Sequence, residues 1–250
     1  MRYTKEDHSM AKAKETPTAG QFIELLKTYR SAIELKKYER YFPVEKRAGD
    51  KFIGVRMGQV FALAQEFIDM PPGEIEKLLE SPIHEVRAGG CSIMGKSGSD
   101  KKVSDNRLKE LYDLYMRRHD RINNWDLVDL AAHQVVGRYL VDKPRKILYK
   151  LARSKNRWER RTAILSTAHF IRKGDTDDAF KIAEILVRDK EDFVQKAAGW
   201  MLRFAGDKDR KRLIRFLDAH AADMPRVALR NSIEHFPKKQ REHYLGLTKE

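Results

Sequence analysis

The sequence predicts an all-α protein built as a helical-repeat solenoid, and three observations support this fold class. Apolar residues recur with helical spacing along almost all of the 250-residue chain. No segment alternates apolar and polar residues between turn signals, so essentially no sheet is expected. A weak internal repeat is also present, because apolar Trp125, Trp158, Phe193 and Val227 follow one another at steps of 33, 35 and 34 residues.

Turn-forming residues such as Pro71-Pro72-Gly73 and Gly206-Asp207 separate the helical segments. Residues 1–18 are polar and are predicted to be a disordered tail, and residues 19–250 are predicted to form a single domain. Helices are predicted over 19–40, 56–69, 73–80, 83–94, 105–121, 125–140, 145–153, 157–172, 176–188, 192–205, 209–222, 226–235 and 238–246.

Each repeat pairs one of these helices with a second one. In the last three repeats a cationic residue follows the apolar marker three positions later, at Arg161, Lys196 and Arg230. Helical hairpins cannot bury their apolar faces alone, so they stack into a curved α–α superhelix. The concave surface of such a superhelix is the natural place for an extended ligand.

The charge of the chain is positive and unevenly placed. Lys and Arg number 51 against 37 Asp and Glu, a formal net charge of +14. Residues 143–173 hold eleven Lys or Arg and one acid, Glu159, which amounts to +10. Such a balance favours a polyanionic partner, either nucleic acid or an anionic membrane. We therefore expect a concave basic groove, although a solvated charged face is the alternative interpretation of this window.

Several classes of protein are excluded by composition. Cys91 is the only cysteine, which excludes an intrachain disulfide and a multi-thiolate zinc site and fits a reducing cytoplasm. The first residues contain no apolar core of a secretory signal, and no run approaches the 18 apolar residues of a membrane span. We expect a cytoplasmic monomer with no metal, no cofactor and no membrane contact.

Residues 90–97, GCSIMGKS, match the phosphate-binding pattern GxxxxGK[ST]. That loop requires a preceding strand and a following helix whose N-terminus holds the phosphate. Here a helical pattern precedes the motif and no strand is expected anywhere. We interpret the segment as a helix that ends at Gly95, followed by a basic loop over 95–102, and expect no nucleotide binding.

Two carboxylates follow a helix start at Asn123 or Asn124. Asp126 falls in the first turn, where a carboxylate stabilises the helix dipole. Asp129 lies one turn further, beyond the reach of capping, and shares a helix face with Trp125 four residues earlier. Asp129 is therefore either a structural acid paired with a repeat arginine or a carboxylate directed into the groove.

The remaining tryptophans differ in their surroundings. Trp158 lies in an apolar row and is predicted to be a core residue. Trp200 follows Lys196 by four residues and precedes Arg203 by three, so its helix face is cationic. Arg161 is either the ordinary cation of its repeat or a residue that holds a phosphate.

With these residues the chain resembles the DNA alkylation repair family of HEAT-repeat DNA glycosylases, the AlkD-like proteins. The resemblance covers about residues 20–236. It rests on the order of four motifs, namely FIGVR at 52–56, NWDLVD at 124–129, WERRTAIL at 158–165 and FVQKAAGWMLR at 193–203. Gly89-Gly90 and the segment 95–102 are departures from the pattern of the family.

The resemblance implies a HEAT-like solenoid and a hydrolase that removes N3- and N7-alkylated purines from duplex DNA. It places the catalytic aspartate at Asp129, the two groove tryptophans at Trp125 and Trp200, and a DNA-contacting arginine at Arg161. It also implies that the lesion need not be flipped into a base pocket.

The chemistry agrees with this resemblance. An N3- or N7-alkylpurine is cationic, so its glycosidic bond is already weakened and the enzyme must stabilise an oxocarbenium-like sugar and supply water. A carboxylate performs both tasks in glycoside hydrolysis. Indole faces attract the developing sugar cation. Neighbouring cations, Arg157, Lys196 and Arg203, are predicted to contact DNA phosphates together with Arg161.

Two other functions remain open from the sequence. A catalytically silent HEAT-repeat protein that binds distorted or branched DNA would keep the basic groove but would not need Asp129. A protein-interaction scaffold would present the basic face to an acidic partner. Fold alone does not separate these three functions.

Overall fold

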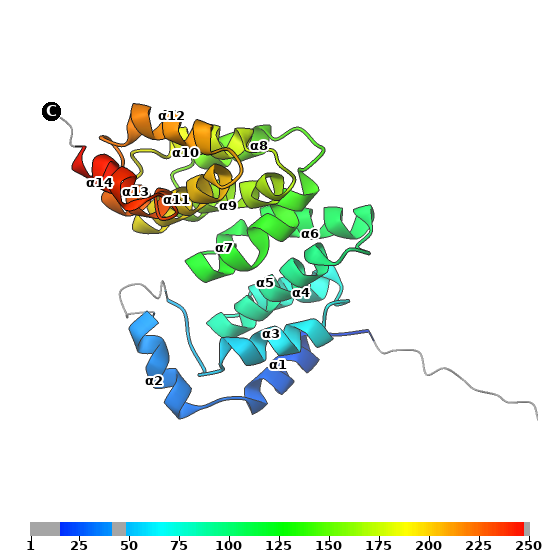
Figure 1. Ribbon diagram of the computed structural model, residues 1–250. Coiled ribbons are helices and arrows are strands. Elements are labelled where there is room, and N and C mark those ends of the chain that lie inside the picture. The colour runs from blue at the N-terminus through cyan, green and yellow to red at the C-terminus, as the bar shows by residue number, and fades with distance from the viewer. Residues whose placement is uncertain (1–15, 42–48, 248–250) are drawn as a thin grey trace, which may run out of the picture.

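The computed structural model describes residues 16–41 and 49–247 of the chain, and Figure 1 shows it as a succession of helices. The described residues contain no strand and only one isolated parallel bridge, between Lys51 and Ile83. The elements are α1 (Ala19–Thr28), α2 (Ala32–Tyr41), α3 (Met57–Glu66), α4 (Pro72–Leu79), α5 (His84–Ser99), α6 (Asp105–Arg117), the 3₁₀ turn η2 (His119–Arg121), α7 (Trp125–Ala131), the π-helical segment η3 (Ala132–Gly137), α8 (Lys146–Ala152), α9 (Arg157–Arg172), α10 (Asp177–Ile185), α11 (Asp192–Gly206), α12 (Arg210–His220), α13 (Arg226–Ser232) and α14 (Lys238–Gly246).

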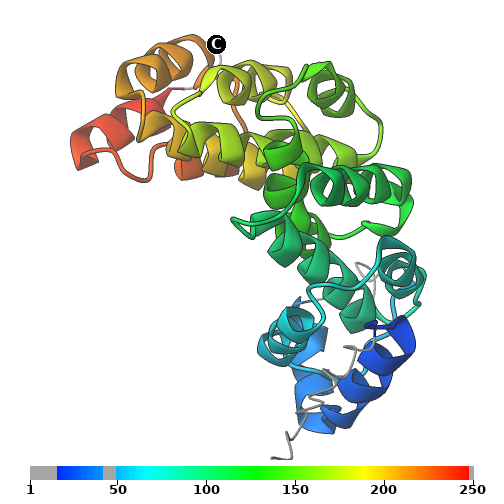
Figure 2. The same ribbon diagram turned by 90° about the vertical axis from the view of Figure 1, so that its right-hand side faces the viewer.

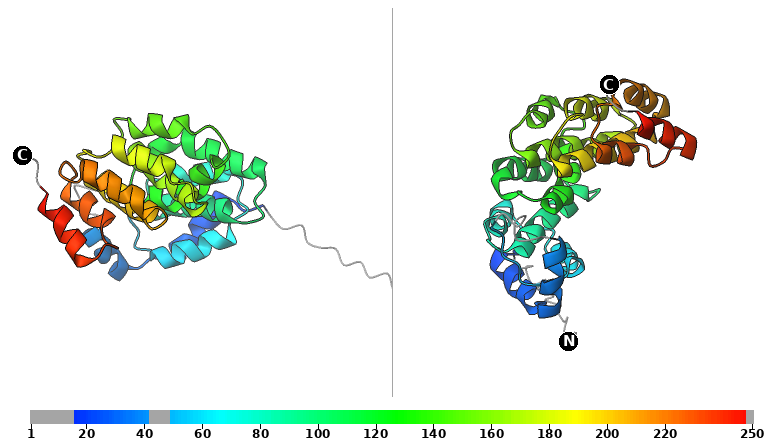
Figure 3. Two further views of the ribbon diagram at one scale, coloured as in Figure 1. Left: turned by 45° about the horizontal axis from the view of Figure 1, so that its top comes forward. Right: turned by 90° about the vertical axis from the view of Figure 1, so that its left-hand side faces the viewer.

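The helices form two rows. The inner row runs α3, α5, α7 with η3, α9, α11 and α13, and each member packs against the next. Helices α4, α8, α10 and α12 each pack against the inner-row helix that adjoins them in sequence and make up most of the outer row. The rows follow an arc from the N-terminal to the C-terminal helices, as Figure 2 and the right-hand view of Figure 3 show. The predicted all-α helical-repeat solenoid is confirmed.

The repeat spacing marks equivalent positions of the inner row. Trp125 is the first residue of α7, and Trp158, Phe193 and Val227 are the second residues of α9, α11 and α13. The ring centroids of Trp158 and Phe193 lie 5.5 Å apart, so equivalent residues of successive repeats are in contact. Trp158 is only 8% exposed, which confirms its predicted place in the core.

The helix predicted over 19–40 is wrong, because the chain breaks at residues 29–31 into α1 and α2. Ser31 starts α2 by accepting a hydrogen bond from the backbone N–H of Glu34 at 3.3 Å. The backbone N–H of Ser31 donates in turn to the carbonyl of Gly54, 3.1 Å away. Of the predicted tail, residues 1–15 lie outside the described residues, and Thr18 caps α1 in a capping box with Gln21.

The loop predicted over 95–102 is also wrong, because α5 continues to Ser99. A Cβ atom added to Gly95 would lie 2.0 Å from the carbonyl oxygen of Leu130, and one added to Gly98 would lie 2.7 Å from that of Gln134. These glycines therefore let α5 approach the backbone of α7 and η3 closely. Helix packing, rather than phosphate binding, explains the GxxxxGKS motif.

The segment predicted as one helix over 125–140 changes its winding after Ala131. Helix α7 passes directly into the π-helical η3, where each turn holds one residue more than in an α-helix. Segments of this kind are frequent at functional sites. No helix of the described ranges is long and apolar enough to cross a membrane.

Candidate nucleic-acid interface

Asp129 is held by an arginine of the next repeat. Its Oδ1 accepts from Nε of Arg161 at 2.9 Å, and its Oδ2 accepts from Nη2 at 2.8 Å. The remaining Nη1 of Arg161 donates to the backbone carbonyl of Phe193. The Asp129 side chain is 26% exposed, whereas that of Arg161 is 6% exposed. Arg161 thus supports the carboxylate from inside the protein while the carboxylate reaches the surface.

The guanidinium of Arg161 is engaged within the protein, and its contact with a DNA phosphate stays a prediction. All three nitrogens of its guanidinium have partners within the protein, and the side chain is buried. Burial raises the pKa of the Asp129 carboxyl, the hydrogen bonds and charge of Arg161 lower it, and the charge of Asp126 raises it, so that the net shift is upward.

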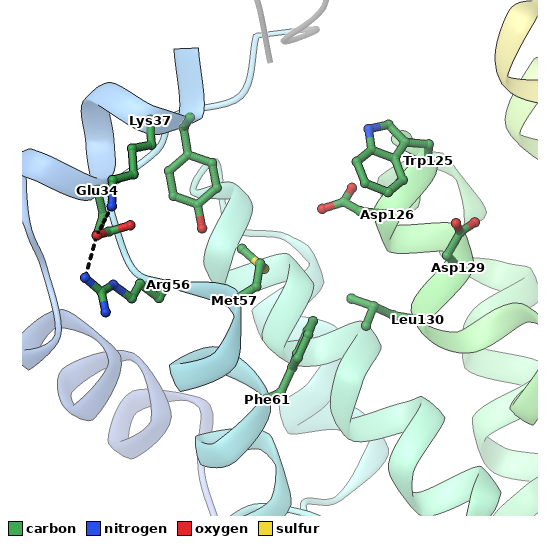
Figure 4. A pocket seen from close by; sticks show the side chains of 10 residues that line it. Glu34, Lys37, Arg56, Met57, Phe61, Trp125, Asp126, Asp129 and Leu130 are labelled. Carbon is green, nitrogen blue, oxygen red and sulfur yellow. Dashed lines mark hydrogen bonds and ion pairs between the residues drawn. The ribbon is translucent and has the colours of Figure 1, made fainter. Parts of the chain in front are cut away.

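The first pocket beside Asp129 lies between α2, α3 and α7 and has a volume of about 540 Å³. Figure 4 shows Trp125, Asp126 and Asp129 on one side of it and Met57 and Phe61 on another. Its lining consists of Glu34, Lys37, Tyr38, Arg56, Met57, Phe61, Trp125, Asp126, Asp129 and Leu130.

The second pocket, of about 210 Å³, lies between α7, η3, α9 and α11. It is lined by Asp129, His133, Leu165, Ala168, Arg172, Trp200, Met201 and Phe204. Asp129 therefore belongs to both pockets, with Trp125 in the first and Trp200 in the second. Trp200 is 43% exposed, which is unusual for so large an apolar side chain.

The other cations that the sequence assigned to DNA are half-exposed or paired with acids. Arg157 lies 3.1 Å from Glu191, Lys196 lies 2.7 Å from Asp192, and Arg203 pairs with Glu234. The guanidinium of Arg157 also covers the ring of Trp158, 4.8 Å from its centroid. These three cations do not line either pocket.

The basic window 143–173 is partly neutralised by acids that lie outside it, so its formal charge of +10 overstates its free positive charge. Arg145 contacts Asp175 and Asp178 at 2.6 and 2.7 Å, and Arg160 contacts Asp189 at 2.6 Å. Within the described ranges, six cations of the window have no carboxylate within 4.0 Å, namely Lys146, Lys150, Arg153, Lys155, Arg172 and Lys173. A smaller basic surface remains for a polyanion.

Asp126 does more than stabilise the start of α7. Asn124 caps that helix, accepting from the N–H of Trp125 at 2.8 Å, which confirms the predicted start. Asp126 lies 2.6 Å from Nε2 of His84, whose Nδ1 lies 2.8 Å from Asp50. Burial lowers the pKa of His84, but the charges and hydrogen bonds of the two carboxylates outweigh it and raise the pKa to about 9.

The sequence reasoning missed several residues of the two pockets. Arg172 and His133 line the second pocket, and Phe61 and Arg56 line the first. Arg172 was detectable, because it lies seven residues after Leu165 on one face of α9. Burial, with the charges of Arg172 and His169, lowers the pKa of His133 to about 4, so it is neutral at physiological pH.

Comparison with known proteins adds a family to this geometry. Residues 22–236 match the family described as DNA alkylation repair enzyme. A solved structure described as a predicted DNA alkylation repair enzyme from Enterococcus faecalis superimposes with a TM-score of 0.64 and 17% sequence identity, covering 84% of this chain and 97% of that one. At this identity the likeness bears on the fold alone. No curated protein matches the sequence.

Proposed function

The chain belongs to the DNA alkylation repair enzyme family, and from this premise we propose that it is a DNA glycosylase. Its substrates are cationic N3- and N7-alkylated purines in duplex DNA, and its reaction is hydrolysis of the N-glycosidic bond. The observation that carries this proposal is the Asp129 carboxylate, which is partly exposed between two pockets and fixed in direction by Arg161.

The reaction needs little from the protein besides electrostatics. As the C1′–N bond breaks, its electron pair neutralises the positive purine, so no general acid is needed. The sugar becomes an oxocarbenium-like cation, and the Asp129 carboxylate stabilises this charge. The oxygen of a water molecule then bonds to C1′, and the proton that it loses passes through Asp129 to solvent. The raised pKa of Asp129 makes its carboxylate a stronger base than an ordinary aspartate.

Arg161 acts through Asp129 and is a positioning residue in this proposal. Each oxygen of Asp129 accepts one hydrogen bond from Arg161 and keeps a further lone pair for water or for the sugar. The guanidinium also keeps the partly buried carboxylate ionised, because its charge and hydrogen bonds oppose the effect of burial on the pKa. A lone carboxylate in the same place would be harder to keep charged.

Trp125 and Trp200 are the side chains that we assign to the sugar and its neighbours. Each shares a pocket with Asp129, and indole faces attract a developing cation with about 0.5–2 kcal/mol per contact. Phosphate binding falls to Arg172 at the second pocket and to Arg157, Lys196 and Arg203. The ion pairs of the last three are partly exposed and therefore weak enough for phosphates to replace their carboxylates.

The same ion pair supports a second candidate, a catalytically silent DNA-binding protein. In that case the pair formed by Asp129 and Arg161 would only join two repeats, as a buried structural ion pair does. The two candidates differ in a single respect, because only the glycosylase needs the negative charge of Asp129 for chemistry.

Release of free base from a duplex that contains N7-methylguanine tests the proposal. Wild type and Asp129→Asn are compared under single-turnover conditions, with DNA affinity measured separately by fluorescence anisotropy. We expect Asp129→Asn to bind DNA as wild type does and to lose at least about 100-fold in excision rate. A matched control is Asp113→Asn, which removes an exposed acid on α6 that pairs with Lys109 and lines neither pocket.

Excision by Asp129→Asn at the wild-type rate would overturn the role of Asp129. The absence of release by wild type from any cationic lesion, with DNA binding retained, would establish the silent binder. The absence of salt-dependent DNA binding would favour a protein-interaction scaffold.

A further inference from the structure

Two histidines without partners lie at and beside the second pocket. His133 lines this pocket together with Arg172 and Trp200. His169 lies three residues before Arg172 on α9, and both histidines are partly buried. Within residues 16–41 and 49–247, neither imidazole has a hydrogen-bond or ion-pair partner. A neutral imidazole carries one donor and one acceptor, and partners are the rule for polar groups that leave water. Both imidazoles are therefore available to a ligand in the groove.

The two histidines lie on segments that are in close contact. A Cβ atom added to Gly137 of η3 would lie 2.2 Å from the carbonyl oxygen of Ser166 and 3.0 Å from the Cβ of His169. This close approach of η3 to α9 brings the histidines near enough for the charges of Arg172 and His169 to act on His133. We call His133, His169 and Arg172 the histidine cluster.

The charges that act on the histidine cluster are cationic. Arg138, at the end of η3, donates to two carbonyls of the C-terminal end of α5 at 2.6 and 2.7 Å. Lys173 follows Arg172 on α9, and neither has a carboxylate within 4.0 Å in the described ranges. The acid of the pocket, Asp129, is already paired with Arg161. Further charged groups on the segments packed against η3 and the end of α9 are Lys96, Arg107, Arg145, Asp175, Asp178 and Arg203, of which the last pairs with Glu234 and Arg145 pairs with both aspartates.

Burial and the neighbouring cations keep both imidazoles neutral. Burial, followed by the charges of Arg172 and His169, lowers the pKa of His133 to about 4. Burial also lowers the pKa of His169 to about 4, with the charges of Lys173 and Arg138 acting in the same direction. A bound anion reverses this effect, because an opposite charge within roughly 4–6 Å raises the pKa of a cationic group by about 1–3.

We propose that the histidine cluster binds a phosphate of the DNA backbone beside Asp129, and that both imidazoles become protonated when the phosphate arrives. This inference rests on the DNA binding that the proposed function requires. It adds two residues to the phosphate contacts that are assigned above to Arg172, and it makes DNA binding dependent on pH.

A phosphate beside Asp129 needs cations that are not permanently charged. The phosphate and the Asp129 carboxylate repel each other, so positive charge between them favours binding. A cluster that was cationic without DNA would also repel itself and the nearby Arg138. Imidazoles avoid that cost, because they stay neutral in the free protein and gain their charge from the proton taken up with the phosphate.

The affinity for an undamaged duplex measures this proton uptake. Fluorescence anisotropy at pH 7.5 and pH 5.0, at one ionic strength, gives the dissociation constants. Because protonation is favoured in the complex, the affinity rises as the pH falls. We expect wild type to gain about tenfold or more between these two pH values. The same affinity at both pH values would overturn the proposal.

Substitution of both histidines isolates their share of the gain. His133→Gln with His169→Gln keeps hydrogen-bonding side chains but removes the titrating group, so the gain should fall below about threefold. His235→Gln is the control, because His235 is 51% exposed, pairs with Asp207 and lines neither pocket. It should gain affinity as wild type does. A wild-type gain in the double variant would refute the role of the histidines.

Imidazole NMR spectra of wild type test the same point without a variant. The pKa values of His133 and His169 should both rise when the duplex is added, and unchanged values would refute the proposal even if the double variant did not fold. Inorganic phosphate alone is the comparison probe. If it raised these pKa values and the duplex did not, the ligand would be a free anion and the assignment to the DNA backbone would be wrong.

Excision assays run in parallel keep the two proposals apart. DNA binding that depends on the two histidines, in a protein that releases no cationic base, refutes the glycosylase function alone, because a silent DNA-binding protein also holds phosphates. Excision by wild type, together with an equal gain of affinity in wild type and the double variant, refutes the histidine cluster alone.

Discussion

Arg161 and Asp129 form a two-pronged ion pair across neighbouring repeats, with Nε 2.9 Å from Oδ1 and Nη2 2.8 Å from Oδ2. The arginine lies near the start of α9 and the aspartate in α7, so the stacking of the two inner-row helices brings them together. Two parallel hydrogen bonds fix the plane of a carboxylate as well as its position. The direction of Asp129 is thus set by the solenoid and does not depend on DNA.

Arg161→Lys tests this positioning. A lysine keeps the charge but makes a point contact in place of the fork. We expect the free energy of unfolding to fall by about 1–3 kcal/mol, because the Asp129 carboxylate loses its buried guanidinium partner. The single-turnover excision rate should fall about tenfold or more. Urea unfolding and base release measure the two effects.

Arg117→Lys is the matched control for that substitution. The Arg117 side chain is 54% exposed on α6 and pairs with Glu76 at 2.7 Å, so a stability change below about 0.5 kcal/mol is expected. If Arg161→Lys behaved like Arg117→Lys in both assays, Arg161 would not be a positioning residue.

The periodicity of the sequence predicts most of the helices and their stacking as repeats. The markers at Trp158 and Phe193 touch because equivalent positions of stacked repeats must lie side by side. The same logic links Asp129 and Arg161, which are 32 residues apart, close to one repeat step. The pairing is one of the two roles that the sequence allows for Asp129, and the repeat length is the signal that favours it.

The structure differs from the sequence predictions where tertiary contacts outweigh local patterns. Gly95 and Gly98 are helix breakers by propensity, yet they sit inside α5 because α7 and η3 approach their backbone closely. The window 143–173 looked uncompensated because its acidic partners, among them Asp189, belong to the next repeat. The number of charged residues or glycines within one segment does not reveal which residues of the next repeat that segment contacts.

Gly95→Ala is predicted to be among the most damaging small substitutions in the chain. The new Cβ would lie 2.0 Å from the Leu130 carbonyl oxygen, and that backbone carries Asp129. We expect a loss of about 3 kcal/mol or more in the free energy of unfolding, or failure to fold. Gly58→Ala in α3 is the control, because its Cβ meets nothing within 4 Å, and it should stabilise the protein by about 0.5–1 kcal/mol. Thermal unfolding of both variants provides the comparison, and similar shifts would refute the close-packing explanation.

His84 makes the stability of the protein dependent on pH. Its ordinary pKa of 6.5 rises to about 9 in the folded chain, where burial opposes the shift and Asp126 and Asp50 produce it. Because the folded-state pKa is raised, the stabilisation is complete below pH 6.5 and is lost as the pH rises toward 9. The expected loss across this window is on the order of 2–3 kcal/mol.

Urea unfolding of wild type and His84→Gln at several pH values between these limits measures that loss. The variant should be less stable than wild type at the acidic end, and the difference should shrink as the pH rises. A difference that stays constant with pH would show that the imidazole is not charged between Asp50 and Asp126.

Alanine substitution of the two tryptophans should affect different properties. Replacing Trp158 in α9 should lower stability, and replacing Trp200 in α11 should lower the excision rate. Trp158 is 8% exposed and packs on Phe193, so Trp158→Ala should reduce the free energy of unfolding by about 3–5 kcal/mol. Trp200 is 43% exposed in the pocket that it shares with Asp129. Trp200→Ala should therefore change stability by less than about 1 kcal/mol and lower the single-turnover excision rate about tenfold.

Stability and excision must both be measured on each tryptophan variant. Ile33→Ala, which removes an apolar side chain that is 71% exposed and lies outside both pockets, controls for the loss of exposed apolar surface. A Trp200→Ala protein that excises at the wild-type rate would remove Trp200 from the site. Large destabilisation in Trp200→Ala would instead assign its indole to the core, because an exposed side chain has few packing contacts to lose. The Trp200→Ala variant could also keep its excision rate and its stability but show a weaker salt dependence of DNA binding. That result would mean that Trp200 only orders the cations around it.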